Sequence, residues 1–269
     1  MIRWEIFHVM NIVFLTADEP LYLPTFFSRL LEQQTGVGLA VFTVPSRYGK
    51  DTNVRMAKRY IRAFGLWNFG RLVEQTVKAK VCDRLGIGRA QGRYYSVASA
   101  AKAHGVPCEL VSKVNDADFL QRLRDMKTDL IVSVSCPQIF RKPLIELAPL
   151  GCLNMHGALL PSYRGIAPSF WMMVHGETKA GVTVHFIDET IDTGAVVEVE
   201  EFDILPDETL DRFIVRSKRI ACDVLLRAIR KVEAGDQQTT PLRKEEGSYF
   251  GFPTRQAYRE FRRRGRKLW

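Results

Sequence analysis

Residues 153–165 read Leu-Asn-Met-His-Gly-Ala-Leu-Leu-Pro-Ser-Tyr-Arg-Gly, and the interpretation of the rest of the chain starts from them. Asn154 and His156 stand two residues apart at the end of an apolar run, and a turn rich in Pro and Gly follows. Side chains two apart in a strand share a face, so the amide and the imidazole are expected to project together. An amide donor can stabilise an oxyanion and an imidazole can move a proton, so the pair suits chemistry at a carbonyl group.

On both sides of this stretch, apolar runs alternate with segments of helical spacing. The patterns predict strands at residues 11–16, 38–44, 109–111, 129–135, 151–156, 182–187 and 195–202. They predict helices at residues 23–34, about 54–85, 95–103, 119–126, 167–175 and 210–232, the fourth capped by Asn115 with Asp118. This alternation predicts an α/β fold whose mostly parallel sheet has helices on both faces. Ligands bind at the carboxyl ends of such strands, where Asn154 and His156 are expected to lie.

A second polar cluster is found at residues 181–194, which read GVTVHFIDETIDTG. A strand is predicted to end at Ile187, and an acidic loop leads into the next strand. Asp192 in this loop is expected to reach His156 and to orient the imidazole or stabilise its charge. Asn154, His156 and Asp192 would then serve acyl transfer to an amine, because the Asn steadies the oxyanion while the His handles the proton. Taken singly, each residue type is more often structural.

The chain resembles the 10-formyltetrahydrofolate-dependent formyltransferases in a joint pattern: Asn154-x-His156, Leu159-Leu160-Pro161, Tyr163-Arg164-Gly165, Asp188 and Ile191-Asp192-Thr193-Gly194. That family includes methionyl-tRNA formyltransferase, glycinamide ribonucleotide formyltransferase and the nucleotide-sugar N-formyltransferases. The resemblance is dense over residues 129–202, weaker over 11–44 and poor over 51–93. It implies a Rossmann-like formyltransferase fold and a one-carbon transferase with Asn154, His156 and Asp192 as its catalytic residues.

The resemblance also implies that the formyl donor is 10-formyltetrahydrofolate, without a metal ion. In this family, the pterin ring of the folate is held largely by main-chain groups of two loops. The matching residues here are Pro137, Gln138, Ile139 and Phe140 in the first loop and Asp188, Glu189 and Ile191 in the second. Ala158 departs from the Ser that many members carry, and a local hydrogen bond is expected to be lost with the hydroxyl group.

The amine that receives the formyl group is the open question. Where the ribonucleotide enzyme has a Gly-rich phosphate loop, residues 16–20 of this chain are acidic. Methionyl-tRNA formyltransferase carries a C-terminal β-barrel, for which the segment after the last long helix is too short. Residues 247–254 resemble the short aromatic C-terminal segment of sugar N-formyltransferases. A small acceptor such as a nucleotide-linked amino sugar is therefore favoured. The alternatives are methionyl-tRNA formyltransferase, a 10-formyltetrahydrofolate hydrolase and a non-catalytic binding protein.

The net charge of +9 is concentrated in two segments. Residues 51–93 and 255–269 carry surpluses of seven and six positive charges, so the rest of the chain is net negative. In the first segment, a helical face is predicted from Ala57, Tyr60, Ile61, Phe64 and Trp67. It favours an amphipathic helix packed on the domain or on a homodimer partner, and the alternative is binding to an anionic membrane, tRNA or nucleotide. The run Arg262-Arg263-Arg264 is interpreted as a disordered, solvated tail, and the alternative is contact with the same anion as the insertion.

Composition sets the remaining expectations. The five cysteines are widely spaced and show no Cys-x-x-Cys pair, which favours free thiols and a cytoplasmic location over a zinc site or a disulfide framework. Residues 1–9 are interpreted as an upstream start or extra sequence without a signal peptide, because a strand begins directly after Met10. The expected organisation is a catalytic domain at residues 10–235, with the basic insertion at 51–93, followed by a short basic C-terminal extension at 236–269.

Overall fold

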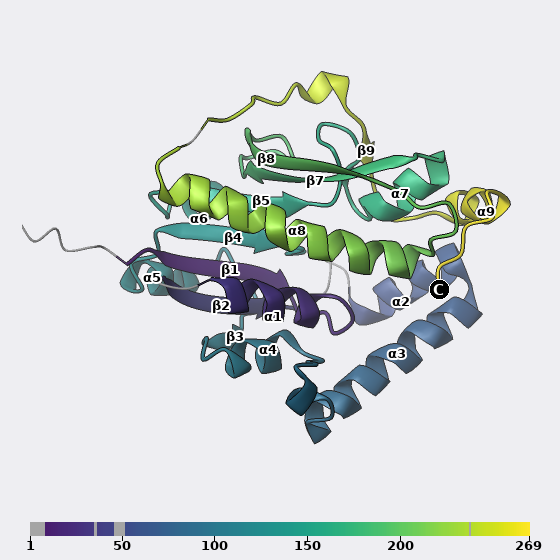
Figure 1. The fold of residues 1–269 in the computed structure, drawn as a ribbon, viewed down its shortest axis with the longest axis horizontal. Helices are drawn as coiled ribbons and strands as arrows, with labels where there is room; N and C mark the ends of the chain where they lie inside the picture. Colours follow the sequence, from purple (N-terminus) through teal and green to yellow (C-terminus); the bar gives the residue numbers. More distant parts are fainter. Residues whose placement is uncertain (1–8, 35–36, 46–51, 237) are drawn as a thin grey trace, which may run out of the picture.

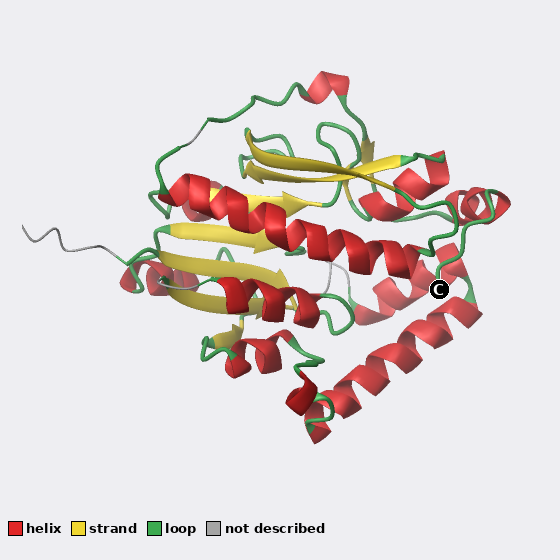
Figure 2. Cartoon of the chain, in the orientation of Figure 1, coloured by secondary structure: helices red, strands yellow, loops and turns green. Residues whose placement is uncertain are grey.

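The computed structural model describes residues 9–34, 37–45, 52–236 and 238–269. The interpretation of residues 1–9 as an upstream start or extra sequence falls almost entirely on residues 1–8, which lie outside the described residues. Figure 1 shows a central sheet with helices packed on both faces, and Figure 2 shows the same arrangement by secondary structure. No helix in the described ranges is long and apolar enough to cross a membrane.

The main sheet has seven strands in the order β3-β2-β1-β4-β5-β7-β8. The strands are β1 (Asn11–Ala17), β2 (Gly38–Val44), β3 (Cys108–Leu110), β4 (Leu130–Val134), β5 (Cys152–His156), β7 (Lys179–Phe186) and β8 (Val196–Asp203). The first five are parallel, whereas β7 and β8 are antiparallel to their neighbours. The predicted mostly parallel α/β sheet is confirmed.

Helices cover the two faces of this sheet with separate apolar clusters. The first cluster packs α1 (Leu23–Gln33), α4 (Val97–Ala103) and α8 (Leu210–Glu233) on one face. The second packs α5 (Ala117–Asp125) and α6 (Lys142–Ile145) on the other. Strands β1 and β4 are buried on both faces, which explains why their sequences are nearly continuous apolar runs.

The predicted strands and helices are confirmed, with their ends shifted by a few residues. Two details differ: the cap of the fourth predicted helix and the continuity of the second. The first concerns Asn115, which does not cap the fourth helix: α5 begins after Asp116. Asn115 instead bridges to the loop after β4, because its Nδ2 donates to the Ile139 carbonyl at 2.9 Å and its Oδ1 accepts from the Arg141 N–H at 2.8 Å. The predicted cap was therefore wrong, and the residue holds a loop that matters for the site.

The second exception is the basic insertion, which forms two helices, α2 (Asn53–Phe64) and α3 (Leu66–Leu85). Gly65, with φ of 89°, ends one helix and begins the other. Glycine adopts this left-handed region without steric cost, so the chain turns here. As a result Phe64 is buried in the third apolar cluster, whereas Trp67 is 84% exposed. The predicted continuous face that included Trp67 was wrong.

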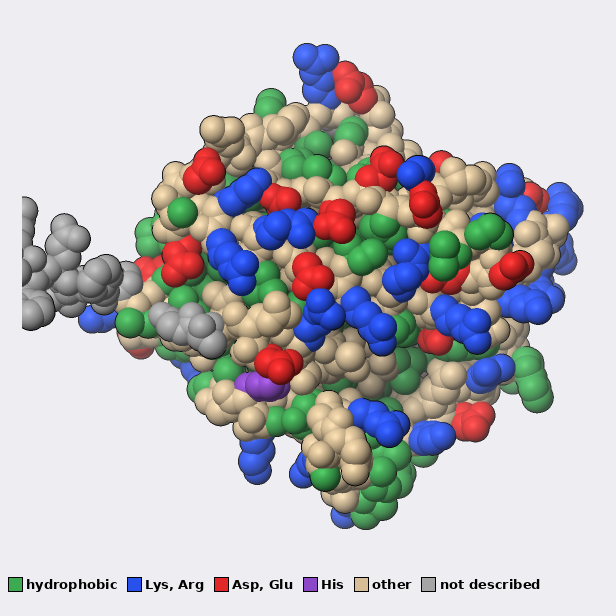
Figure 3. Space-filling view, in the orientation of Figure 1, with side chains coloured by type: hydrophobic (Ala, Val, Ile, Leu, Met, Phe, Trp, Pro, Cys, Tyr) green, Lys and Arg blue, Asp and Glu red, His purple; other side chains and the backbone are tan. Residues whose placement is uncertain are grey.

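The Arg-rich segment is ordered, contrary to the interpretation as a disordered tail. Helix α9 (Arg255–Arg263) includes Arg262 and Arg263, and Thr254 caps it by accepting from the Ala257 N–H at 3.1 Å. Phe261 is fully buried and stacks on Phe170 of α7 (Pro168–His175) with 5.2 Å between ring centroids. Buried aromatic contacts fix this helix, and its arginines form a basic edge beside α7 (Figure 3).

Short elements that the sequence patterns did not predict complete the fold. They are the two-residue strands β6 (Arg164–Gly165) and β9 (Tyr249–Phe250), which pair in parallel, and the 3₁₀ turns η1 (Arg89–Gln91) and η2 (Lys244–Glu246). The pairing of β6 with β9 joins the C-terminal residues to the turn after β5. The division of the chain at residue 235 stays a prediction.

Candidate functional site

Strand β5 presents Asn154 and His156 on one face, as its alternation predicts. Leu153 and Met155 pack into the first apolar cluster, whereas Cys152 packs into the second, on the opposite face. Asn154 and His156 share the side of Cys152 because they are two and four residues further along the strand. His156 is 6% exposed and Asn154 half-buried. The two polar side chains thus extend the second cluster towards the carboxyl end of the strand.

Asp192 reaches this pair from the loop between β7 and β8. Its Oδ1 accepts from Asn154 Nδ2 at 3.3 Å, and its Oδ2 accepts from the Gly165 N–H at 2.8 Å. Oδ2 lies 3.7 Å from His156 Nδ1, which is an electrostatic contact rather than a hydrogen bond. The structure therefore brings Asn154, His156 and Asp192 together.

The ring of His156 is oriented by a main-chain carbonyl. Its Nε2 lies 2.8 Å from the carbonyl oxygen of Tyr163, which only accepts, so Nε2 carries a proton and donates it. In the neutral ring, Nδ1 then keeps a lone pair on the side of Asp192. Burial lowers the pKa of His156 below its ordinary value, and this outweighs the opposing effects of Asp192 and of the Tyr163 carbonyl. The imidazole is therefore neutral at pH 7 and able to accept a proton at Nδ1.

Asp192 remains ionised in this buried setting. Burial alone would raise its pKa, but the contacts with His185 and His156 and the Gly165 N–H together lower the pKa to about 2. Only 11% of the side chain is exposed, so solvent screens these interactions weakly. The site thus holds one fixed negative charge beside a neutral imidazole.

His185 is a member of the cluster to which sequence analysis assigned no role. It stands opposite Asn154 in the antiparallel pairing of β5 with β7. Its Nδ1 donates to the Phe186 carbonyl at 2.7 Å, so its Nε2 accepts from Asn154 Nδ2 at 3.2 Å. Both N–H groups of Asn154 are therefore engaged, one by His185 and one by Asp192. The residue was present in the 181–194 cluster, but only the strand register shows that it faces Asn154.

Three residues around the site have left-handed backbone conformations without being glycine. They are Ser135, Tyr163 and Asp192, with φ values of 54°, 59° and 54°. Such conformations are uncommon for residues with a side chain and cluster at functional sites, where the surroundings hold them. Two of them direct a group at the cluster, the carboxylate of Asp192 and the carbonyl of Tyr163, whereas the exposed Ser135 accepts from Lys218 through its hydroxyl group.

The first expected folate loop leaves β4 on the face where Asn154 lies. Cys136 and Phe140 pack against the second apolar cluster, and Phe140 is 6% exposed. Gln138 fixes the loop through its side chain, which accepts from the Val114 N–H at 3.1 Å and donates to the Ser112 carbonyl at 2.9 Å. Pro137 is half-buried and Ile139 is 67% exposed. The side chains of Gln138 and Phe140 thus hold the loop in place, whereas the side chain of Ile139 is exposed.

The second expected loop is closed by its own hydrogen bonds. Asp188 accepts from the Thr190 N–H at 2.9 Å and from the Thr193 hydroxyl at 2.7 Å. Glu189 is exposed and Ile191 is 43% exposed. Ile187, just before the loop, packs against the second cluster, as do Cys136 and Phe140 of the first loop. Both loops therefore leave the sheet on the face of Asn154.

The C-terminal segment supports the carbonyl that holds His156. Ser248 accepts from the Tyr163 N–H through Oγ at 2.9 Å and from the Arg164 N–H through its carbonyl at 2.9 Å. The ring of Phe250 stacks on that of Tyr163 with 5.4 Å between centroids. Gly165 has φ of 96°, and a Cβ atom there would lie 2.3 Å from the Phe250 carbonyl oxygen. Only glycine allows this approach, so the extension belongs to the site.

Lys218 of α8 is a second group that sequence analysis missed. Its Nζ donates to Ser135 Oγ at 2.8 Å, directly before the first folate loop. Burial lowers the pKa of Lys218 to about 8, although Glu19 opposes this. Burial in turn raises the pKa of Glu19, whose carboxylate accepts from the first N–H groups of α1. The helical spacing of α8 shows its apolar side only and gives no signal for an ammonium group at the carboxyl edge of the sheet.

Across the described residues, no group of three or more His, Cys, Asp or Glu side chains is arranged to hold a metal ion. The five cysteines are all free thiols.

The fold and this site define a class of protein that sequence comparison identifies. A profile of the formyl transferase family matches residues 10–229, and the chain belongs to that family. The resemblance inferred from the motifs is thereby confirmed. The methionyl-tRNA formyltransferase of Syntrophus aciditrophicus (strain SB) is 39% identical over 150 residues, which cover 56% of this chain and 48% of that protein. The corresponding protein of Clostridioides difficile (strain 630) is 33% identical over 153 residues, 57% of this chain and 50% of that one. The chain thus spans about half the length of the curated relatives it matches.

Solved structures with the same fold cover most of the chain at low identity. A sugar N-formyltransferase from Shewanella sp. FDAARGOS_354 superimposes with a TM-score of 0.56 at 20% identity, over 90% of this chain and 77% of that one. Glycinamide ribonucleotide transformylase 1 from Symbiobacterium toebii superimposes with a TM-score of 0.58 at 17% sequence identity, over 88% of this chain and 95% of that one. The N-formyltransferase from Helicobacter canadensis, in complex with folinic acid and dTDP-3-aminofucose, superimposes with a TM-score of 0.57 at 16% sequence identity. The match covers 90% of this chain and 71% of that one. These likenesses confirm the Rossmann-like formyltransferase fold.

Proposed function

We propose that this protein transfers a formyl group from 10-formyltetrahydrofolate to a primary amine. The observation that carries the proposal is the buried cluster of Asn154, His156 and Asp192 in a chain of the formyl transferase family. The cluster combines an amide, a neutral imidazole with a free Nδ1 and a fixed carboxylate, which are the groups that acyl transfer to an amine requires.

The surroundings of the cluster fit a folate donor. The two loops at 136–140 and 188–191 leave the sheet on the face of Asn154 and present the aliphatic side chains of Ile139 and Ile191. Main-chain groups together with exposed aliphatic edges suit a flat heterocycle that has several donors and acceptors. The bound donor would supply an electrophilic formyl carbon next to the cluster.

Each residue of the cluster has a role that its contacts define. The neutral amine nitrogen attacks the formyl carbon, and Nδ1 of His156 accepts the proton that this nitrogen then loses, while the adjacent Asp192 carboxylate stabilises the resulting imidazolium. The carbon–nitrogen bond to the folate breaks, and the proton passes to the departing folate nitrogen. Asn154 donates to Asp192 and His185 in this structure, so one of its N–H groups must exchange partner to stabilise an oxyanion. The Tyr163 carbonyl keeps the imidazole oriented throughout.

For the acceptor, we favour a small primary amine such as an amino sugar on a nucleotide carrier. The C-terminal segment supports this choice because residues 248–250 bind directly to the turn after β5 and complete the site. The aromatic segment at 247–254 resembles that of sugar N-formyltransferases, and a structural relative is described with dTDP-3-aminofucose bound. Methionyl-tRNA formyltransferase is the second candidate, because the sequence relatives that carry this name are up to 39% identical.

A screen of amines with the purified chain tests the proposal. The candidates are UDP- and dTDP-linked amino sugars, methionyl initiator tRNA and glycinamide ribonucleotide, each with 10-formyltetrahydrofolate. We expect tetrahydrofolate to form only with an amine present, and fastest with a nucleotide-linked amino sugar. Fastest turnover with methionyl-tRNA would establish the second candidate. Release of formate without any amine would identify a hydrolase, and no turnover of the folate would favour a non-catalytic binding protein.

A further inference from the structure

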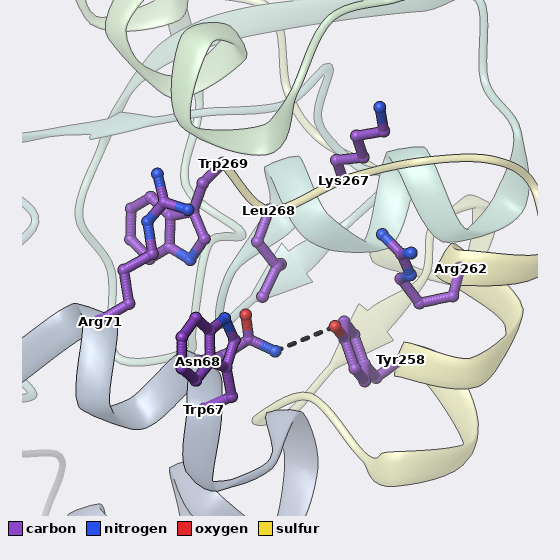
Figure 4. Close-up of a pocket in the computed structure, with 8 residues that line it drawn as sticks. All are labelled: Trp67, Asn68, Arg71, Tyr258, Arg262, Lys267, Leu268 and Trp269. Atoms are coloured by element: carbon purple, nitrogen blue, oxygen red, sulfur yellow. Dashed lines mark hydrogen bonds between the residues drawn. The ribbon is translucent and has the colours of Figure 1, made fainter.

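A pocket lies away from the cluster of Asn154, His156 and Asp192, where the insertion meets the last residues of the chain (Figure 4). It has a volume of about 360 Å³, within the range of small-molecule sites. We call it the tail pocket, and the residues that line it are Trp67, Asn68, Arg71, Tyr258, Arg262, Lys267, Leu268 and Trp269. The two most basic segments of the sequence, 51–93 and 255–269, thus form one concave surface.

The walls of the tail pocket are fixed by contacts within the chain. Asn68 Nδ2 donates to the Phe64 carbonyl at 2.8 Å and to the Tyr258 hydroxyl at 3.0 Å, which ties α3 to α9 (Figure 4). Leu268 is buried in the third apolar cluster. The carbonyls of Lys267 and Leu268 accept from the first N–H groups of α8, both at 2.9 Å. The pocket is therefore formed before any ligand arrives.

The lining is rich in positive charge that the chain does not neutralise. Arg71, Arg262 and Lys267 line the pocket, and no acidic residue does. Within the part of the chain that the structure describes, no Asp or Glu forms an ion pair with these three side chains. The acid of α9, Glu260, pairs with Arg263 and Arg264 instead. Three positively charged side chains around one concavity favour an anionic ligand with several oxygen atoms.

Two tryptophans in the lining favour a ligand that also has a flat ring and a hydrogen-bond acceptor, which a simple anion does not combine. Trp67 is 84% exposed at the rim, although a large aromatic side chain normally packs against other residues. Arg71 already covers the ring of Trp269, with its guanidinium carbon 5.6 Å from the centroid. In the described ranges, the Trp269 indole N–H is buried without an acceptor. A buried donor of this kind is costly unless a ligand supplies the acceptor.

We propose that the tail pocket binds a nucleotide, with its phosphate oxygens on Arg71, Arg262 and Lys267 and its base on the face of Trp67. A nucleotide has several negative charges and hydrogen-bond acceptors for the basic side chains of the lining, and a flat base that can stack on Trp67. The site goes beyond the proposed formyl transfer, because its residues come from α3, α9 and the last residues rather than from β5 and the loops around it. The nucleotide is either free or part of a single-stranded RNA.

Equilibrium binding to the full chain tests this proposal, with UDP, uridine, inorganic pyrophosphate and octauridylate as probes. We expect UDP to bind more tightly than uridine or pyrophosphate, because only UDP uses both the cations and Trp67. Arg71→Gln and Arg262→Gln should each weaken UDP binding about tenfold, and Trp67→Ala about 5- to 100-fold with much of the loss restored by Trp67→Phe. Binding of UDP should quench tryptophan fluorescence more strongly in the wild type than in Trp67→Phe, which keeps only Trp269 in the pocket.

The matched control is Arg84→Gln, which removes an exposed positive charge from the same helix outside the pocket. It should leave UDP binding unchanged. The proposal is overturned if Arg84→Gln weakens binding as much as Arg71→Gln, if pyrophosphate binds as tightly as UDP, or if neither UDP nor octauridylate binds. Tighter binding of octauridylate than of UDP, with the same sensitivity to Arg71→Gln, identifies RNA as the source of the nucleotide, and the reverse order identifies a free nucleotide.

Discussion

At the scale of single residues, His156 sets the expected pH dependence of turnover. Burial lowers its pKa below the ordinary value of 6.5, so the basic form predominates at pH 7. Because the protonated ring cannot accept the proton of the amine, turnover at saturating substrates should be flat from pH 6.5 to 7.5 and should fall at some lower pH. A pH profile of kcat checks this, and a decline centred above pH 7 would contradict it.

Asp192 couples the site to stability in acid. Its pKa falls from 3.8 to about 2 on folding, which corresponds to about 2 kcal/mol, since one pKa unit is about 1.4 kcal/mol. A lowered pKa stabilises the fold above pH 3.8, and this stabilisation is lost as pH falls towards 2. Asp192→Asn should therefore lower the free energy of unfolding at pH 6 by about 2 kcal/mol and by progressively less below pH 4.

Urea unfolding between pH 6 and pH 3 measures this difference. The control is Asp236→Asn, which removes an exposed carboxylate just after α8. A difference between wild type and Asp192→Asn that stays constant over this pH range would show that the charge of Asp192 does not carry the effect.

Sequence analysis found the residues of the cluster but not their network. Asn154 and His156 follow from strand alternation, and Asp192 from its place in the motif that resembles the family. His185 and Lys218 do not, because their proximity depends on strand register and on how α8 lies over the sheet. The roles of Pro137, Gln138, Ile139, Phe140, Asp188, Glu189 and Ile191 in folate binding stay predictions.

At the scale of elements, the pairing of β6 with β9 links the C-terminal segment to the carbonyl that holds His156. Ser248 Oγ is the acceptor for the Tyr163 N–H, and Tyr163 orients His156 through its carbonyl. Loss of this acceptor leaves an N–H group unsatisfied at a cost of about 1–3 kcal/mol. We expect Ser248→Ala to lower kcat about tenfold with little change in the KM for the folate.

The control for this variant is Thr239→Ala, an exposed residue of the same segment that should leave kcat unchanged. Equal kcat values for Ser248→Ala and Thr239→Ala would contradict the link between β9 and His156.

Helix α9 supplies a prediction about stability alone. Phe261 is fully buried against Phe170, so Phe261→Ala should cost about 3–5 kcal/mol of the free energy of unfolding. Arg263→Ala removes an exposed side chain from the same helix and should change stability by less than about 0.5 kcal/mol. Urea unfolding compares the two, and similar values would show that α9 does not pack as described.

The elements also show where sequence patterns are sufficient. Long periodic segments such as α8 and buried β-branched strands such as β4 were predicted almost to the residue. Strands of two residues, β6 and β9, form only through tertiary contacts and have no periodicity to detect. Helix α9 was missed because its arginines dominate the sequence, whereas its buried residues are only Ala257 and Phe261.

At the scale of the whole molecule, the fold places two sites of different character. The catalytic cluster is buried and built on the sheet, where parallel strands end and β7 runs antiparallel. The tail pocket is basic and is formed by the two segments with the weakest family resemblance. The motifs over residues 129–202 point to formyl transfer, whereas the sequence alone does not determine the acceptor amine.

The most direct test of formyl transfer at this site follows radiolabelled formyl from 10-formyltetrahydrofolate to the best amine of the screen. Wild type should transfer the label, and His156→Ala should do so at least about 10²-fold more slowly while unfolding in urea as a single cooperative transition. His104→Ala, a histidine outside the cluster that contacts Ser28, should transfer at the wild-type rate. Transfer by His156→Ala at the wild-type rate would contradict the assignment of the site, and label recovered only as formate would contradict transfer to an amine.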